Sequence, residues 1–311
     1  MMNVLLNIVL PVFALIGAGW LARRKQWLGP TAAAELNRFV VYVAMPALLF
    51  RIMATASWSD LAQPGFTAAF GIGCGVIFVA AIAQGRRRGH DLADASLGGL
   101  NASYANVGFI GFPLCLAAFG PSSLTSVTIS AIVTVCALFG VSVALMEWSQ
   151  NQGSGLHILR KSLVSVVRNP MVMAPVVGVI YGATVSTVPT GADHFLKYLS
   201  DAASPCALVS LGAFIGEERQ PTRWSKVSPL VALKLFGQPS VTWVFAHMVF
   251  HLSPALTGVA VVIAALPTGT GPYMLANMYG RDAQAVAGSI LMSTLLSLIT
   301  ITGLIALLGS G

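Results

Sequence analysis

Runs of about 20 apolar residues, separated by short polar loops, follow one another along the chain, and each matches a bilayer core of roughly 30 Å. We expect membrane-spanning helices near residues 3–22, 33–52, 65–84, 95–120, 122–147, 168–186, 194–216, 227–250, 253–280 and 284–308. Only 9% of the 311 residues are charged and 56% are hydrophobic, whereas a soluble domain carries about 25% charged residues. The sequence therefore predicts an all-α integral membrane protein with ten transmembrane helices.

The basic residues lie in alternate loops, which predicts the orientation of the chain. The loops after the first, third, fifth, seventh and ninth spans hold 13 of the 17 Lys and Arg, namely Arg23, Arg24, Lys25, Arg86, Arg87, Arg88, Arg160, Lys161, Arg168, Arg219, Arg223, Lys226 and Arg281. Basic loops stay in the cytoplasm, so we expect both termini on the other side. The first span has no basic residues before its apolar core, so we expect it to be retained. These loops explain the net charge of +7, and we expect no nucleic-acid partner.

The two halves of the chain share landmarks in the same order. Their matching residues are Pro11 with Pro175, Pro46 with Pro205, Gly111 with Gly271 and Gly120 with Gly280. Five spans per half is an odd number, so the second half enters the membrane in the opposite direction, as in many secondary transporters. We expect a first five-helix repeat at 1–147, a cytoplasmic loop at 148–167 and a second, inverted repeat at 168–311.

The stretch "ALPTGTGPYMLANMYG" (265–280) interrupts an apolar run with two prolines and several glycines. Proline removes a backbone donor and glycine permits unusual backbone geometry, and irregular backbone persists in lipid only where protein or water satisfies it. We expect breaks near 106–113 and 267–272, so that half-helix N-termini attract an anion. The alternative is proline kinks that only shape packing. The residues expected to break helices are Pro46, Gly111, Pro113, Pro205, Pro267, Gly271 and Pro272.

Several motifs resemble the auxin efflux carrier family, which includes the plant PIN-type carriers and many bacterial transporters. The matching stretches are "NRFVVYVAMP" (37–46), "NVGFIGFPL" (106–114), "VVRNP" (166–170), "LSDA" (199–202), "SLG" (210–212) and "AALPTGTGPYMLA" (264–276). The long central loop of the plant carriers is absent, as in a compact bacterial member. Asn277 and Thr268 stand where plant members commonly carry a lysine and an amide, which argues against an indole-bearing substrate.

This resemblance implies a fold related to that of the bile-acid sodium symporters. The fourth and ninth helices are then interrupted and cross at the substrate site. It also implies a scaffold and a moving transport part, as in an elevator, a homodimer, and alternating-access transport of carboxylate-bearing anions across a bacterial inner membrane. Asn106, with Pro113 after it, occupies the first crossing, and Pro267, Gly269 and Pro272 occupy the second.

The candidate site residues carry side chains that can donate to a carboxylate. The amide of Asn106 suits that role, while Asn101 and the threonines could instead satisfy freed backbone groups at the breaks. The predicted substrate-binding set is Asn106, Ser103, Met45, Pro113, Thr268, Gly269, Thr270 and Pro272.

Three charged residues are candidates for coupling transport to an ion gradient. Asp201 is expected two turns into a span, where acids are costly and often functional. The alternative is structural pairing with Lys197, four residues earlier on the same helix face, or with Lys234. Lys234 could also attract anions or extend towards the interface.

Other functions find less support in the sequence. An intramembrane protease would need paired aspartates, a Ser–His pair or His-Glu-x-x-His, and the four cysteines lack metal-ligand spacing. We therefore expect no enzyme, no metal and no cofactor. The partners expected are a small organic anion and membrane lipids. A sodium-coupled symporter, a proton-coupled carrier and a membrane ligand sensor remain open alternatives.

Overall fold

The computed structural model describes residues 5–56, 62–149, 164, 170–185, 188–217 and 224–308. Within these residues every regular element is a helix. The chain forms two compact units. Each unit takes segments from both halves of the sequence, so the expected repeats are interleaved between units. Most of the expected cytoplasmic loop at 148–167 lies outside the described residues.

The first unit comprises Met1–Gln63, Gly108–Thr128 and Arg168–Arg219. Some of its helices contain π-helical turns, labelled η. Its elements are η1 (Leu5–Val9), α2 (Leu10–Arg24), α3 (Ala32–Phe39), η2 (Val40–Ala44), α4 (Met45–Thr55), most of η3 (Val107–Gly111), α8 (Phe112–Phe119), the start of α9 (Ser123–Ile132), α12 (Pro170–Thr184) and α13 (Thr190–Gly216).

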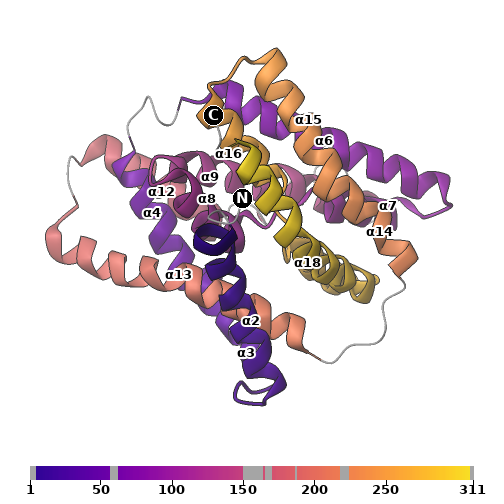
Figure 1. Ribbon diagram of the computed structural model, residues 1–311, viewed down its shortest axis with the longest axis horizontal. Helices are drawn as coiled ribbons and strands as arrows, with labels where there is room; N and C mark the ends of the chain where they lie inside the picture. Colours follow the sequence, from indigo (N-terminus) through magenta and orange to yellow (C-terminus); the bar gives the residue numbers. More distant parts are fainter. Residues whose placement is uncertain are drawn as a thin grey trace. The chain divides into compact units, whose positions relative to one another are not determined.

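Glycines let pairs of helices in this unit approach closely. A Cβ at Gly19 in α2 or at Gly212 in α13 would collide with backbone carbonyl oxygens of the other helix (Figure 1). A Cβ at Gly178 in α12 would lie 2.7 Å from the Phe50 carbonyl oxygen of α4. Small residues at such crossings are the usual means of packing membrane helices.

Two expected helix breaks are wrong. Residues 32–55 form one continuous helix through Pro46, and Thr190–Gly216 continues through Pro205. The π-helical turn η2 directly precedes Pro46, and its wider turn leaves room for the proline ring. Pro205 removes one hydrogen bond to the carbonyl of Asp201, but packing of α13 against α2 and α4 holds the helix together.

The second unit comprises Pro64–Val107, Ile129–Val167 and Gln220–Gly311. Its described elements are α6 (Pro64–Arg87), α7 (Leu92–Ser103), the end of α9, η4 (Val133–Phe139), α10 (Gly140–Ser149), α14 (Trp224–Ala232), η5 (Leu233–Gly237), α15 (Gln238–Trp243), η6 (Val244–Val249), α16 (Pro254–Ala264), α17 (Gly271–Met278) and α18 (Ala283–Leu308).

Close packing of α6 organises this unit. A Cβ at Gly99 of α7 would lie 2.9 Å from the Phe78 carbonyl oxygen of α6, and Gly73 of α6 contacts Thr242 of α15. Ile77, Ala81 and Ala102 form a buried cluster against which Leu230 and Leu233 pack. Apolar contact and small residues therefore fix α7 and α14–α15 on α6.

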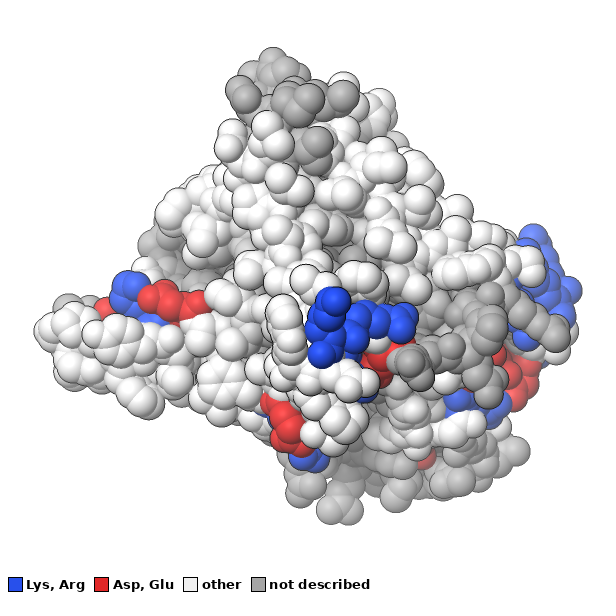
Figure 2. Space-filling model, turned by 60° about the horizontal axis from the view of Figure 1, so that its bottom comes forward, with Lys and Arg blue, Asp and Glu red and all other residues white. Residues whose placement is uncertain are grey.

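Six described helices are long and apolar enough to cross a membrane: Leu6–Arg24, Ala32–Thr55, Pro64–Arg87, Ser123–Ser149, Thr190–Gly216 and Ala283–Leu307. Three shorter apolar helices are Val107–Phe119, Pro170–Thr184 and Pro254–Ala264. Charged residues occupy a few separate places on the face drawn in Figure 2, and uncharged residues make up most of it. These features indicate a multi-pass membrane protein.

Candidate functional site

Two helices that begin in the second unit are interrupted. The first, α7, ends at Ser103, where Tyr104 takes an extended conformation (φ −79°, ψ 95°), and helix resumes at Val107. The second, α16, ends at Ala264, and α17 begins at Gly271. The residues between these helices are Tyr104–Asn106 in the first break and Ala265–Thr270 in the second.

The two breaks are paired by backbone hydrogen bonds. Ala105 and Thr268 form an antiparallel bridge. The Asn106 N–H donates to the Pro267 carbonyl oxygen at 2.9 Å, and the Gly269 N–H donates to the Tyr104 carbonyl oxygen at 3.0 Å. An apolar medium makes unsatisfied backbone groups costly, so each break satisfies groups that the other has freed.

Polar side chains complete this pairing. The Thr268 hydroxyl donates to the Asn101 carbonyl oxygen at 3.0 Å, and the Thr268 N–H donates to Ser293 Oγ of α18 at 3.1 Å. The Asn101 amide donates to Ser289 Oγ, also of α18, at 2.8 Å. The Thr268 hydroxyl therefore satisfies a backbone carbonyl at the break, as the capping alternative predicts. The Asn101 side chain instead bonds α18, which supports the crossing from one side.

The second break approaches Tyr104 closely. A Cβ at Gly269 would lie 3.1 Å from the Tyr104 ring, and a Cβ at Gly271 would lie 2.5 Å from its Cζ atom. Only glycine leaves enough room at Gly271. The glycines of this stretch thus permit contact with the first break as well as an unusual backbone path.

The position of the first break differs from the expected one. Gly111 and Pro113 lie inside the continuous segment Val107–Phe119, so neither breaks the helix. Pro113 occupies the first turn of α8, after the π-helical turn η3, where its ring is accommodated. In the second break, Pro267 is non-helical and Pro272 lies in the first turn of α17, where a missing N–H costs least.

The predicted site residues fall into two groups. Asn106 is 4% exposed and Thr268 is fully buried, and both lie at the crossing with Gly269, Thr270 and Pro272. The Ser103 hydroxyl donates back to the Gly99 carbonyl oxygen of its own helix at 2.8 Å. Met45 and Pro113 belong to the first unit, where the Met45 Cε atom lies 3.5 Å from a Cβ built at Gly108.

Lys234 is fully buried and bonds within the second unit. Its Nζ donates to the Ala264 carbonyl oxygen, the last of α16, at 2.6 Å. Because Nζ is buried against this carbonyl, the expected extension of Lys234 towards the interface is wrong. Instead its side chain supplies a hydrogen-bond donor at the C-terminal end of an interrupted helix, where the last carbonyl groups lack partners within the helix.

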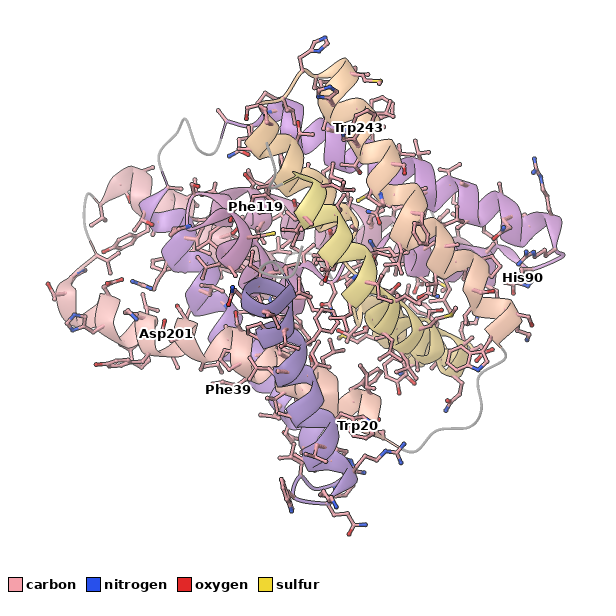
Figure 3. The ribbon with its side chains drawn as sticks, viewed as in Figure 1. Trp20, Phe39, His90, Phe119, Asp201 and Trp243 are labelled. Carbon is pink, nitrogen blue, oxygen red and sulfur yellow. The ribbon has the colours of Figure 1, made fainter. Side chains whose placement is uncertain are left out.

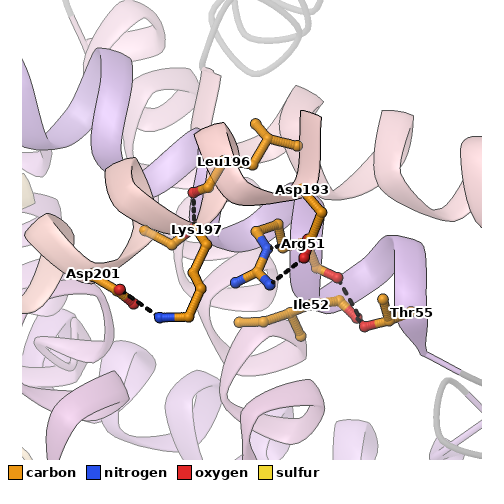
Figure 4. A network of polar contacts seen from close by, with 8 residues as sticks. Arg51, Ile52, Thr55, Asp193, Leu196, Lys197 and Asp201 are labelled. Carbon is orange, nitrogen blue, oxygen red and sulfur yellow. Dashed lines mark hydrogen bonds and ion pairs between the residues drawn. The ribbon is translucent and has the colours of Figure 1, made fainter. Parts of the chain in front are cut away.

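Asp201 is exposed and forms the expected ion pair (Figure 4). Lys197 Nζ lies 2.6 Å from Asp201 Oδ2, and the Asp201 side chain is 58% exposed. On the same helix, Asp193 accepts two hydrogen bonds from Arg51 of α4, at 2.7 and 3.2 Å. Arg51 lies outside the five basic loops, and this second ion pair compensates its charge.

Among the described residues, one buried acid was not predicted. Glu147 at the end of α10 is 1% exposed, and it accepts a hydrogen bond from the Tyr279 hydroxyl, directly after α17. Asp201 was expected to be buried instead, and that expectation is wrong because its side chain is 58% exposed.

Other residues at the crossing were also missed. Tyr104 carries no charge and no helix-breaking property, so only its place next to the break marks it. Ser289 and Ser293 are four residues apart in an apolar helix, followed by Ser297, and all three are buried. This serine spacing was the available signal. Among the described residues no group of three His, Cys, Asp or Glu could hold a metal ion.

Comparison with known proteins identifies the family. The profile of the family described as "Membrane transport protein" matches residues 4–305. The chain belongs to this family. Its members are transporters rather than enzymes, and the expected resemblance to the auxin efflux carriers is confirmed. The chain is therefore a multi-pass membrane transporter.

Relatives of this membrane transport protein include a Rhizobium meliloti protein named "Putative malonate transporter", 27% identical over 98% of this chain and 96% of the relative. An "Uncharacterized transporter" of Methanothermobacter thermautotrophicus is 28% identical over 94% of this chain and 95% of the relative. "Auxin efflux carrier component 8" of Arabidopsis thaliana is 27% identical over 47% of this chain and 41% of the relative.

Proposed function

We propose that the chain is a secondary transporter that carries small organic anions, including malonate, by alternating access at the paired breaks. One observation carries this proposal. Two helix interruptions far apart in the sequence are held together by the Asn106–Pro267 and Gly269–Tyr104 backbone bonds. Paired interruptions of this kind form substrate sites in secondary transporters.

The groups at the crossing suit an anion. The first N–H groups of α17 lack partners within the helix, and its N-terminus carries a positive partial charge. The buried Asn106 amide lies beside the second break and can donate to a carboxylate oxygen. The name of the Rhizobium meliloti relative supports a dicarboxylate as small as malonate.

The proposed architecture places ten spans in two inverted five-helix repeats, 1–147 and 168–311. One unit serves as scaffold and the other moves as an elevator, with both termini outside the cytoplasm of a bacterial inner membrane. A homodimer would hold the scaffolds in place. The carrier needs no resident cofactor, and we favour proton coupling or uncoupled transport over sodium coupling.

Uptake by purified protein in liposomes tests this function. We expect labelled malonate to accumulate in exchange for internal malonate, and Asn106→Ala to lower the rate at least tenfold without loss of folded protein. Asn277→Ala removes an exposed amide that bonds only the Tyr273 carbonyl of its own helix, and should transport normally. Equal rates in all three proteins would remove Asn106 from the site, and no uptake of malonate or related carboxylates would refute the function.

A further inference from the structure

A cavity lies in the second unit, at the ends of four helices. Its volume is about 190 Å³, and it is lined by residues from α6, α7, α14 and α18 and the loops beside them. The lining residues that carry its chemistry are Arg88, His90, Asp94, Asn101, Lys226 and Asp282. Figure 3 places His90, one of the lining residues, at the turn that follows α6.

The acids of this cavity already have partners. Asp94 Oδ1 accepts a hydrogen bond from Arg281 at 3.3 Å. Asp282 Oδ1 accepts one from the Ala285 N–H at 3.0 Å, capping α18. Arg88 and Lys226 form no ion pair among the described residues. Within the described part of the chain, the cavity therefore offers two cations without an ion pair beside two acids that accept hydrogen bonds.

One helix begins at this cavity. Ala285 and Val286 lie in the first turn of α18. Helix N-termini carry positive partial charge that falls off within one turn. This charge adds to that of Arg88 and Lys226, so the cavity favours an anion.

The side chain of Asn101, which lines the cavity, needs a hydrogen-bond donor. Its side chain is 3% exposed. The Ser289 hydroxyl donates its one proton to the Ala285 carbonyl oxygen at 3.2 Å, so it must accept from the Asn101 amide N–H. The Asn101 Oδ1 atom is then left without a hydrogen-bond partner among the described residues. A buried acceptor of this kind is costly unless a donor meets it.

The size of the cavity restricts its occupant. A volume of about 190 Å³ is below the roughly 300 Å³ at which sites for drug-sized ligands begin. It holds about six water-sized groups, taking about 30 Å³ for each. This volume favours a compact anion over a drug-sized ligand.

We infer that this cavity binds a small anion that also carries a hydroxyl group, such as a hydroxydicarboxylate or hydrogen phosphate. Arg88 and Lys226 bind its negatively charged oxygens, and Asn101 accepts its O–H. The site adjoins the crossing at Asn101, whose carbonyl oxygen accepts the Thr268 hydroxyl. It does not depend on which anion the protein transports.

Calorimetric titration with tartronate and malonate tests the inference, since tartronate is malonate with one added hydroxyl. We expect wild-type protein in neutral-lipid nanodiscs to bind tartronate several-fold more tightly than malonate. The double variant Arg88→Gln/Lys226→Gln should weaken tartronate binding at least tenfold. Arg87→Gln/Lys25→Gln, which removes two exposed cations outside the cavity, should leave it unchanged. Asn101→Leu, if it folds, should remove the preference for tartronate.

The same anion chemistry occurs in lipid headgroups. Nanodiscs that contain phosphatidylglycerol distinguish the sources. Weaker tartronate binding there, in wild type but not in the double variant, would identify the headgroup as occupant, and equal binding would identify a free anion. Equal tartronate binding by wild type and double variant, or no preference over malonate, would overturn the inference.

Discussion

The side-chain nitrogen of Lys234 donates a 2.6 Å hydrogen bond to the carbonyl oxygen of Ala264. Ala264 is the last residue of α16, where carbonyl groups lack partners within the helix. The Lys234 side chain therefore satisfies one of these buried acceptors next to the crossing. We therefore regard Lys234 as part of the support of the proposed anion site, although it lies outside the breaks themselves.

Lys234→Met tests this role. The substitution keeps a long apolar side chain and leaves the Ala264 carbonyl without its donor, so we expect the free energy of unfolding to fall by about 1–3 kcal/mol. Malonate exchange should slow at least tenfold. Lys25→Met, at an exposed lysine after α2, should change neither quantity. Normal exchange by Lys234→Met would assign Lys234 to packing alone.

The Thr268 hydroxyl is expected to hold the two breaks together. Thr268→Val keeps the shape of the side chain but leaves the buried Asn101 carbonyl without its donor, so unfolding free energy should fall by about 1–3 kcal/mol. Thr184→Val is the matched control, because the exposed Thr184 hydroxyl bonds only its own helix. Denaturant titration of both variants gives the comparison, and equal stabilities would contradict the assigned contact.

Gly271 should not tolerate alanine. The added Cβ would lie 2.5 Å from the Tyr104 ring, so we expect Gly271→Ala to lower the melting temperature. Tyr104→Leu should restore part of the loss, giving a non-additive double mutant. Gly303→Ala, at a position of α18 with open space, should be neutral or stabilising by up to about 1 kcal/mol. Additive effects at positions 104 and 271 would argue against the contact.

Asp91 should make stability depend on pH in the acid range. The Asp94 N–H, and then Arg281, hold the pKa of Asp91 below its ordinary value of 3.8. A lowered folded-state pKa stabilises the fold above the unfolded value, and the stabilisation is lost as pH falls through the folded value. The melting temperature of wild type should therefore exceed that of Asp91→Asn above pH 3.8, with the difference vanishing at lower pH. A difference constant with pH would contradict the shift.

The sequence located the second break because its signal is local. Pro267, Pro272 and the glycines beside them disfavour helix whatever surrounds them. The first break has no proline, and its position depends on hydrogen bonds to residues 267–269. These long-range hydrogen bonds cannot be read from the sequence. The break was therefore predicted too close to Pro113.

Among the charged residues, local contacts could also be predicted from the sequence, whereas long-range contacts could not. The Lys197–Asp201 pair follows from a spacing of four residues in a helix and was predictable. The partner of Lys234 is a backbone carbonyl 30 residues later, and backbone acceptors leave no mark in a sequence. Pro46 and Pro205 were predicted to break helices because the effect of π-helical turns and of neighbouring helices cannot be read from the proline itself.

Protection of a cysteine at position 270 by substrate tests the central claim most directly. Thr270 is part-exposed and directly precedes α17. In a chain whose four cysteines are replaced by serine, we expect saturating malonate to slow maleimide labelling of Thr270→Cys at least fivefold, and to leave Asn277→Cys at the far end of α17 unaffected. Labelling of both positions at the same rate with and without malonate, in protein that binds malonate, would contradict an anion site at the paired breaks.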